Sequence, residues 1–121
     1  MNLTDHNARL PRLKLNDPME PRELMNEISA RSGLVPADVV GVIYELGANL
    51  LNCCRYARPL RLEGIGLFAP TVRLDGTIHI RFKPDKGLLK ELNLSNNLKK
   101  HITHRQNLGK SLEELGEDRD A

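Results

Sequence analysis

Basic side chains alternate with apolar ones between residues 71 and 83, and no other segment has residue types that point so clearly to a chemistry. Successive side chains of an extended strand point to opposite faces, so this alternation predicts one apolar face and one basic face. A basic face nearly free of acid can neutralise the phosphates of a nucleic acid. The alternative is an ordinary solvated sheet face. The candidate residues are Arg73, His79, Arg81 and Lys83, joined by Arg61 from an earlier strand and Arg58 at the edge.

The charge of the chain is small but unevenly placed. The formal net charge is +2, yet residues 55–90 hold eight Lys or Arg against three acidic residues, whereas residues 20–54 hold two against five. A localised basic surface is the electrostatic signature of a phosphate-binding face. His79 could contribute a hydrogen bond on this face, but a lone histidine is better explained as an incidental polar residue.

Other chemistries have weak support. Cys53 and Cys54 are adjacent and cannot form a disulfide with each other without severe distortion, and nothing brings them near the pair His101 and His104, which a metal site would require. The cysteines fit small core residues at a helix end. We find no nucleophile with a base, no phosphate-cradling glycine loop and no paired acids, so we expect no enzyme activity, cofactor, metal or small-molecule substrate.

Length and composition predict one small domain with an aliphatic core. The chain has 121 residues, two Phe, two Tyr and no Trp, so a single chain would be only marginally stable and association of subunits is expected. No apolar run is long enough for a membrane span and the N-terminus lacks a secretory pattern. We therefore expect a cytoplasmic protein without membrane contact.

The remaining periodicities predict three helices around the strands. The first begins at Pro21 and stops at Gly33, and the second begins at Pro36 with a wide apolar face. A strand over 60–62 precedes the alternating segment, and a third helix runs from about Asp85 to Leu94. Gly41 and Gly47 in the second helix indicate either close approach of another helix or simple tolerance.

The loop of the hairpin decides which side chains share a face. Asp75-Gly76 predicts a turn, and a three-residue loop of Leu74, Asp75 and Gly76 places Val72 opposite Ile78. A two-residue turn would instead bring an apolar side chain beside a polar one. The apolar pattern therefore favours the longer loop, with Gly76 as the bulge glycine.

The segment Leu60-Arg61-Leu62-Glu63-Gly64-Ile65-Gly66-Leu67-Phe68 carries two alternate glycines between strands, and Ile65 is expected in a core. This motif resembles the turn between the first two strands of the bacterial HU and integration host factor family. Ser32-Gly33-Leu34 is similar to the family's turn between the first two helices, and the segment from Phe82 to Lys90 is similar to its entry to the last helix. The resemblance covers residues 20–94, leaving residues 1–19 as an extended or disordered arm and 95–121 as a polar segment, helical or disordered.

The resemblance implies an α+β fold: two N-terminal helices, a three-stranded antiparallel sheet with a short hairpin, and a C-terminal helix, in an intertwined homodimer. It further implies double-stranded DNA as partner, a nucleoid location, and either a homodimer or a heterodimer with another HU-like subunit. The backbone amides of Gly64 and Gly66 would contact phosphates, and Lys86 would join Lys83 at the start of the last helix. The long basic arm with a proline at its tip, typical of the family, is missing between Arg73 and Thr77.

Two functions therefore remain open from sequence. The first is non-specific binding of duplex backbone and shape through a basic sheet surface, with reduced bending of the DNA. The second is an interaction or structural module on the HU scaffold that has lost DNA binding, in which the terminal segments recruit a protein.

Overall fold

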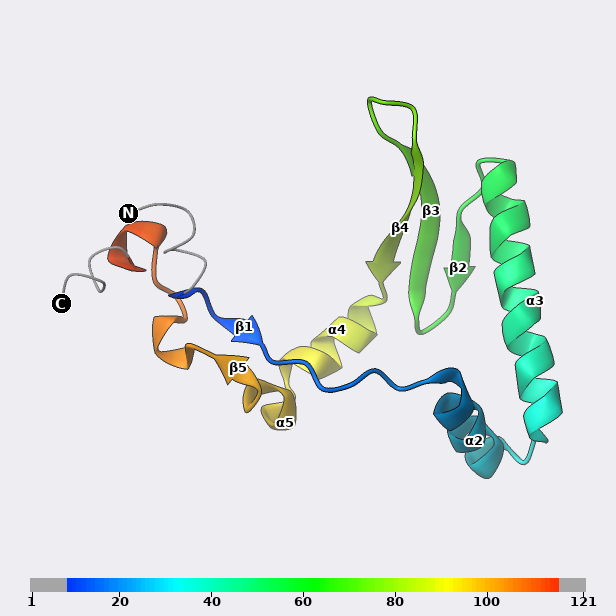
Figure 1. Cartoon of the computed structure of the whole chain (residues 1–121), viewed down its shortest axis with the longest axis horizontal. Helices are drawn as coiled ribbons and strands as arrows, with labels where there is room; N and C mark the ends of the chain where they lie inside the picture. The colour runs from blue at the N-terminus through cyan, green and yellow to red at the C-terminus, as the bar shows by residue number, and fades with distance from the viewer. Residues whose placement is uncertain (1–8, 116–121) are drawn as a thin grey trace. The chain divides into compact units, whose positions relative to one another are not determined.

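The computed structural model describes residues 9–115, which form two compact units (Figure 1). The central unit contains residues 18–93. The terminal unit is built from both ends of the chain, residues 9–17 and 94–115 of those described. The predicted domain limits at residues 19/20 and 94/95 lie close to this division and stay a prediction.

The central unit begins with two helices, α2 (Pro21–Ser32) and α3 (Pro36–Arg55). Each has a proline in its first turn, where the missing amide hydrogen leaves no helical bond unmade. Gly33 ends α2 with φ at 76° and donates its amide to Ser29 O over 3.1 Å. The predicted starts of both helices and the glycine stop are confirmed.

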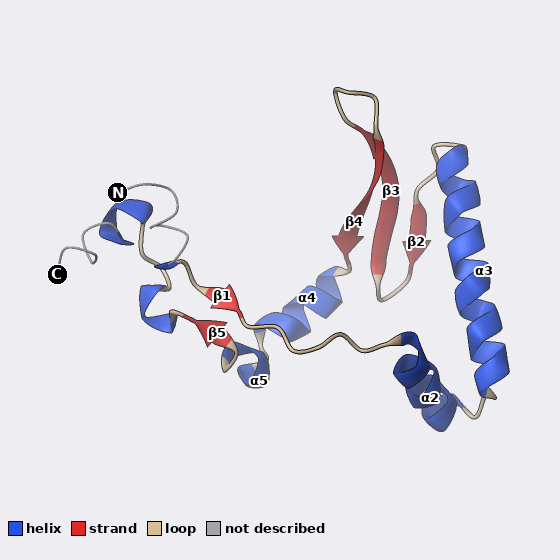
Figure 2. Ribbon diagram, in the orientation of Figure 1, coloured by secondary structure: helices blue, strands red, loops and turns tan. Residues whose placement is uncertain are grey.

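Three antiparallel strands follow, in the order β2 (Leu60–Leu62), β3 (Gly66–Val72) and β4 (Ile78–Pro84) (Figure 2). Val72 lies opposite Ile78, as the apolar pattern predicted.

The turn between β3 and β4 has the predicted three-residue loop. Arg73 N donates to Thr77 O over 3.0 Å, and Gly76, with φ at 90°, donates to Arg73 O over 2.9 Å. A positive φ suits glycine because a side chain there would be strained. The loop length and the role of Gly76 are confirmed.

Helix α4 (Lys86–Asn93) closes the central unit. Asp85 caps it, since its Oδ2 accepts a hydrogen bond from Leu88 N at 3.2 Å. The order of helices and strands confirms the predicted α+β fold.

The apolar faces of the central unit are only partly covered within one chain. Val39 on α3 is 3% exposed, but Ile80 is 52% exposed and both Val72 and Ile78 are 67% exposed. Ile65, expected in a core, is 49% exposed. Hydrophobic pattern shows which face is apolar; it does not show whether the same chain covers it.

The terminal unit is held together by a short ribbon of two strands, β1 (Arg12–Leu13) and β5 (Ile102–Thr103). Helix α5 (Asn96–Lys99) precedes β5 and the 3-10 helix η1 (Arg105–Asn107) follows it. The structure therefore pairs the two ends of the chain, whereas the sequence predicted a separate arm over residues 1–19 and a separate polar segment over residues 95–121. The outermost parts of both segments, residues 1–8 and 116–121, lie outside the described residues.

Within residues 9–115, no single helix is long and apolar enough to cross a membrane; only α2 and α3 taken together reach the required length and composition, and they are bent by 116°. The same residues contain no cluster of three or more His, Cys, Asp or Glu placed to hold a metal ion. Cys53 and Cys54 are free thiols, both half-buried.

Candidate nucleic-acid interface

The strand register places most of the predicted basic residues on one face of the sheet. Arg61 on β2 pairs with Leu67 on β3, which pairs with Lys83 on β4, so two cations flank one leucine. Arg81 faces Ala69 in the next row on this side of the sheet. We call this side the basic face; its positions are Arg61, Leu67, Ala69, Thr71, Arg73, Thr77, His79, Arg81 and Lys83.

The opposite side of the sheet is apolar. Phe68 and Phe82 face each other across β3 and β4, with ring centroids 4.7 Å apart, and Pro70 faces Ile80. The sequence pattern found this division but did not extend the basic face back to Leu67 and Ala69. Pairing of β2 with β3 could have revealed them, because Leu67 lies opposite Arg61 and residues opposite each other point to the same face.

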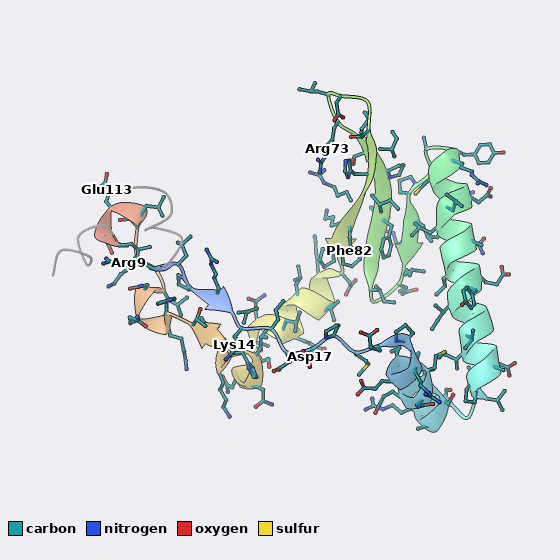
Figure 3. The ribbon with its side chains drawn as sticks, viewed as in Figure 1. Arg9, Lys14, Asp17, Arg73, Phe82 and Glu113 are labelled. Atoms are coloured by element: carbon teal, nitrogen blue, oxygen red, sulfur yellow. The ribbon has the colours of Figure 1, made fainter. Side chains whose placement is uncertain are left out.

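At the turn end of the hairpin, Asp75 introduces an acid next to the basic face. Its Oδ1 accepts hydrogen bonds from Thr77 N at 3.0 Å and Thr77 Oγ1 at 2.7 Å. These bonds, the backbone one first, hold the pKa of Asp75 below its usual value. Asp75 is therefore ionised at neutral pH. Figure 3 shows Arg73 at this same end of the hairpin, with Phe82 toward the other end.

The double-glycine turn lies at the other end of the sheet. Gly64 has φ at 79° and Gly66 has φ at 156°. A Cβ on Gly66 would meet the carbonyl oxygen of Lys83 and lie 2.7 Å from Phe82 Cε1. Asp85 N donates to Ile65 O over 2.9 Å, which ties the turn to the start of α4. Close approach of the backbone to β4 thus explains Gly66.

A groove of about 660 Å³ lies between this turn and the start of α4. Five of the nine predicted contact residues line it: Arg61, Gly64, Gly66, Lys83 and Lys86. Three of these side chains are cationic. Glu63 and Asp85 also line the groove, and the sequence reasoning did not assign either to the site. Asp85 Oδ2 accepts the capping bond from Leu88 N, and both carboxylates weaken the positive potential of the groove.

The predicted residues therefore fall into groups. Arg61 and Lys83 belong to both the basic face and the groove, whereas Arg73, His79 and Arg81 lie on the face alone. Arg58 is in neither group: it follows α3, where its amide donates to Cys53 O over 2.9 Å.

Comparison with solved structures identifies the fold. The chain resembles an HU variant from Thermotoga maritima with a TM-score of 0.53 and 20% sequence identity, over 61% of this chain and 99% of the other. At this identity the likeness shows the fold alone. No curated protein matches the chain.

A family model adds evidence from the sequence itself. Residues 3–81 match the HU-HIG family, described as an HU domain fused to a wHTH, Ig or glycine-rich motif. The match spans α2, α3, β2, β3 and most of β4, the elements that carry the basic face. Because it covers more than half of the chain, it establishes membership: the chain belongs to the HU-HIG family.

Proposed function

We propose that this protein binds double-stranded DNA through the basic face, recognising the duplex backbone and shape with little sequence preference. The observation that carries the proposal is the register, which brings Arg61, Arg81 and Lys83 onto one side of the sheet with no acid among its strand positions. Cations arranged in this way neutralise phosphates and release counterions irrespective of base sequence. Membership of an HU family supports the same partner.

The groove beside the glycine turn supplies a second set of contacts for the same duplex. Lys83 and Lys86 lie at the start of α4 and line the groove, where their ammonium groups can contact phosphates beside the Asp85 cap. Gly64 is exposed and its amide adds a donor, whereas Gly66 is buried against β4 and contributes the geometry of the turn. Arg58 and His79 take lesser roles at the margin of the surface.

We further propose that two copies pair through the apolar faces of the central unit. The exposed apolar side of β4, including Ile80 and Phe82, and the half-exposed face of α3 are too extensive for a stable isolated chain. The HU fold supports a homodimer, and a heterodimer with a related subunit would bury the same faces. The basic faces of two copies then form one saddle, and the complex resides with the nucleoid.

The short hairpin supports weak bending. Strands β3 and β4 have seven residues each, and their loop is only Leu74, Asp75 and Gly76, without a proline. Proteins that kink DNA strongly insert an apolar wedge between base steps. Leu74 is fully exposed at the tip, but it sits on a hairpin too short to wrap the duplex.

The double variant Arg73→Ala/Arg81→Ala tests the basic face. We expect it to weaken binding by roughly tenfold and to reduce the salt slope by up to about two, because each phosphate contact contributes close to 0.9 to that slope. The loss should be equal for two unrelated duplex sequences. Fluorescence anisotropy with labelled duplexes measures both quantities.

The matched control is Arg22→Ala/Arg31→Ala, which removes the same charge from α2. Equal losses in the two double variants would mean that net charge, not the basic face, drives binding. Unchanged affinity in Arg73→Ala/Arg81→Ala would exclude the face.

Bending is tested separately by energy transfer between dyes at the two ends of a duplex. We expect a small increase in transfer on saturation, and no change in it for Leu74→Ala. A large increase that Leu74→Ala abolishes would show that the short hairpin does wedge into the duplex.

One observation favours a protein-binding module as the second candidate. The central unit is nearly neutral, with ten Lys or Arg against nine Asp or Glu over residues 18–93. If the protein does not bind duplex DNA even at low salt, the protein-binding module replaces DNA binding as the leading proposal. Its partner would then be sought among proteins that co-purify with it.

A further inference from the structure

The described residues of the terminal unit, 9–17 and 94–115, carry an excess of positive charge. Its described residues contain seven Lys or Arg and two His against three acidic residues. The cations are Arg9, Arg12, Lys14, Lys99, Lys100, Arg105 and Lys110, and the acids are Asp17, Glu113 and Glu114. The full unit, residues 1–17 and 94–121, has eight Lys or Arg against seven acidic residues, so the excess of positive charge lies in the described part. The proposed DNA-binding surface does not use these cations.

Strand pairing gathers part of this charge onto one side of the ribbon. Arg12 lies opposite Thr103 and Leu13 opposite Ile102, and Lys14 N donates to His101 O over 2.8 Å. Side chains alternate along a strand, so Arg12, Lys14, His101 and Thr103 share one side while the two apolar residues share the other. The polar side therefore contains cations and hydrogen-bond donors, but no acid.

Contacts behind the ribbon hold the two ends of the chain together. Asn107 is 6% exposed, and its Nδ2 donates to Arg9 O over 2.8 Å. The guanidinium of Arg9 donates to the carbonyl oxygen of Leu115, whose own side chain is fully buried. Residues 91 positions apart are thus paired, and the backbone segments that carry these cations form one small platform.

The charged groups on this platform are open to a ligand. Lys14, Lys99, Lys100 and Arg105 are all exposed, and none of them pairs with a carboxylate within residues 9–115. Figure 3 shows Lys14 on the ribbon segment of the terminal unit. A solvated surface generally mixes both signs of charge. Thr103 Oγ1 donates to Arg12 O over 3.1 Å, so the groups available to phosphate oxygens are the cations.

We propose that the terminal unit is a second, separate binding surface for the phosphate backbone of duplex DNA, centred on Lys14 and Lys100. It goes beyond the proposed function, which uses the sheet of the central unit alone, and either surface can exist without the other. The ribbon and its flanking cations contact backbone only, because strands of two residues are too short to read base edges in a groove.

The test uses the full chain carrying Lys14→Gln/Lys100→Gln, titrated against a labelled duplex over a salt series. We expect a loss of affinity of roughly tenfold and a fall in the salt slope of up to about two. Lys14→Arg/Lys100→Arg keeps the charge and should bind as the parent chain does. Arg22→Gln/Arg31→Gln removes equal charge from α2 and should have little effect. Thermal unfolding by circular dichroism verifies that all variants are folded.

Comparison with Arg73→Ala/Arg81→Ala separates this inference from the proposed function. If only the sheet variant loses affinity, the second surface is excluded and the first stands. If only Lys14→Gln/Lys100→Gln loses affinity, the terminal unit binds and the sheet does not. Equal losses in the glutamine variant and the α2 control would also overturn the inference, as would tighter binding of the parent chain to anionic vesicles than to duplex DNA.

Discussion

Gly64 and Gly66 bracket the same turn but are required for different reasons. Gly64 has a left-handed φ of 79° with open space around its Cα, so a side chain there would be strained without a clash. Gly66 combines an unusual φ with close contact to β4, where Phe82 and the backbone of Lys83 occupy the position of a Cβ. The sequence indicated both explanations, positive φ or close approach, but spacing alone did not assign one to each glycine.

Gly66→Ala should therefore destabilise the protein more than Gly64→Ala. A left-handed alanine costs about 1–2 kcal/mol, which is the whole effect expected at Gly64. At Gly66 the displacement of packed neighbours adds about 1–3 kcal/mol. Denaturant unfolding at one fixed protein concentration measures both free energies. Equal losses, or a neutral Gly66→Ala, would contradict the packing seen in the structure.

Among the elements, the β3–β4 hairpin was predictable down to its register. Only the three-residue loop puts Val72 opposite Ile78, and a slip of one residue would have mixed the two faces. The same register determines which cations share the basic face. The sequence could not reveal how far the apolar face is covered, because that depends on what packs against it and not on the pattern along the strand.

The apolar face of the sheet should be a subunit contact. Ile80 on β4 is 52% exposed in a single chain, so Ile80→Asp costs little in an isolated subunit but buries a charge in a dimer. We expect Ile80→Asp to dissociate the dimer at micromolar concentration. His79→Asp, on the opposite face of the same strand, is the control and should remain dimeric.

Sedimentation velocity distinguishes these outcomes. A parent chain that sediments as a monomer at micromolar concentration would contradict the dimer outright. An Ile80→Asp variant that stays dimeric would place the subunit contact elsewhere, most simply on the exposed face of α3.

On the scale of the whole molecule, the pairing of the two chain ends was beyond sequence reasoning. Strands β1 and β5 contribute two residues each, too few to show a period, and their partners lie far apart in the chain. A helix with Leu98, Ile102 and Leu108 on one side, one of the two possibilities that the sequence left open for residues 95–121, would need a continuous period of 3.6. Instead, Ile102 lies in β5, and the neighbouring His104 adopts a left-handed conformation with φ at 53°.

The fold and the nucleic-acid surface could be predicted from the sequence to different extents. Order of elements, turn chemistry and the apolar pattern are local signals, and the α+β fold followed from them through the resemblance to the HU family. The nucleic-acid surface depends on pairing between strands, so the sequence found its cations but not the row formed by Arg61, Leu67 and Lys83 or the groove next to it.

Titration of the parent chain against a fluorescent duplex over a salt series tests the central claim most directly. The account predicts that log K falls linearly with log salt between about 50 and 200 mM, with a slope of about −0.9 for each phosphate contacted. Two unrelated sequences should give the same slope, and a nicked duplex should bind more tightly if bent shape is recognised. Absence of binding at the lowest salt, or binding that is independent of salt, would contradict it.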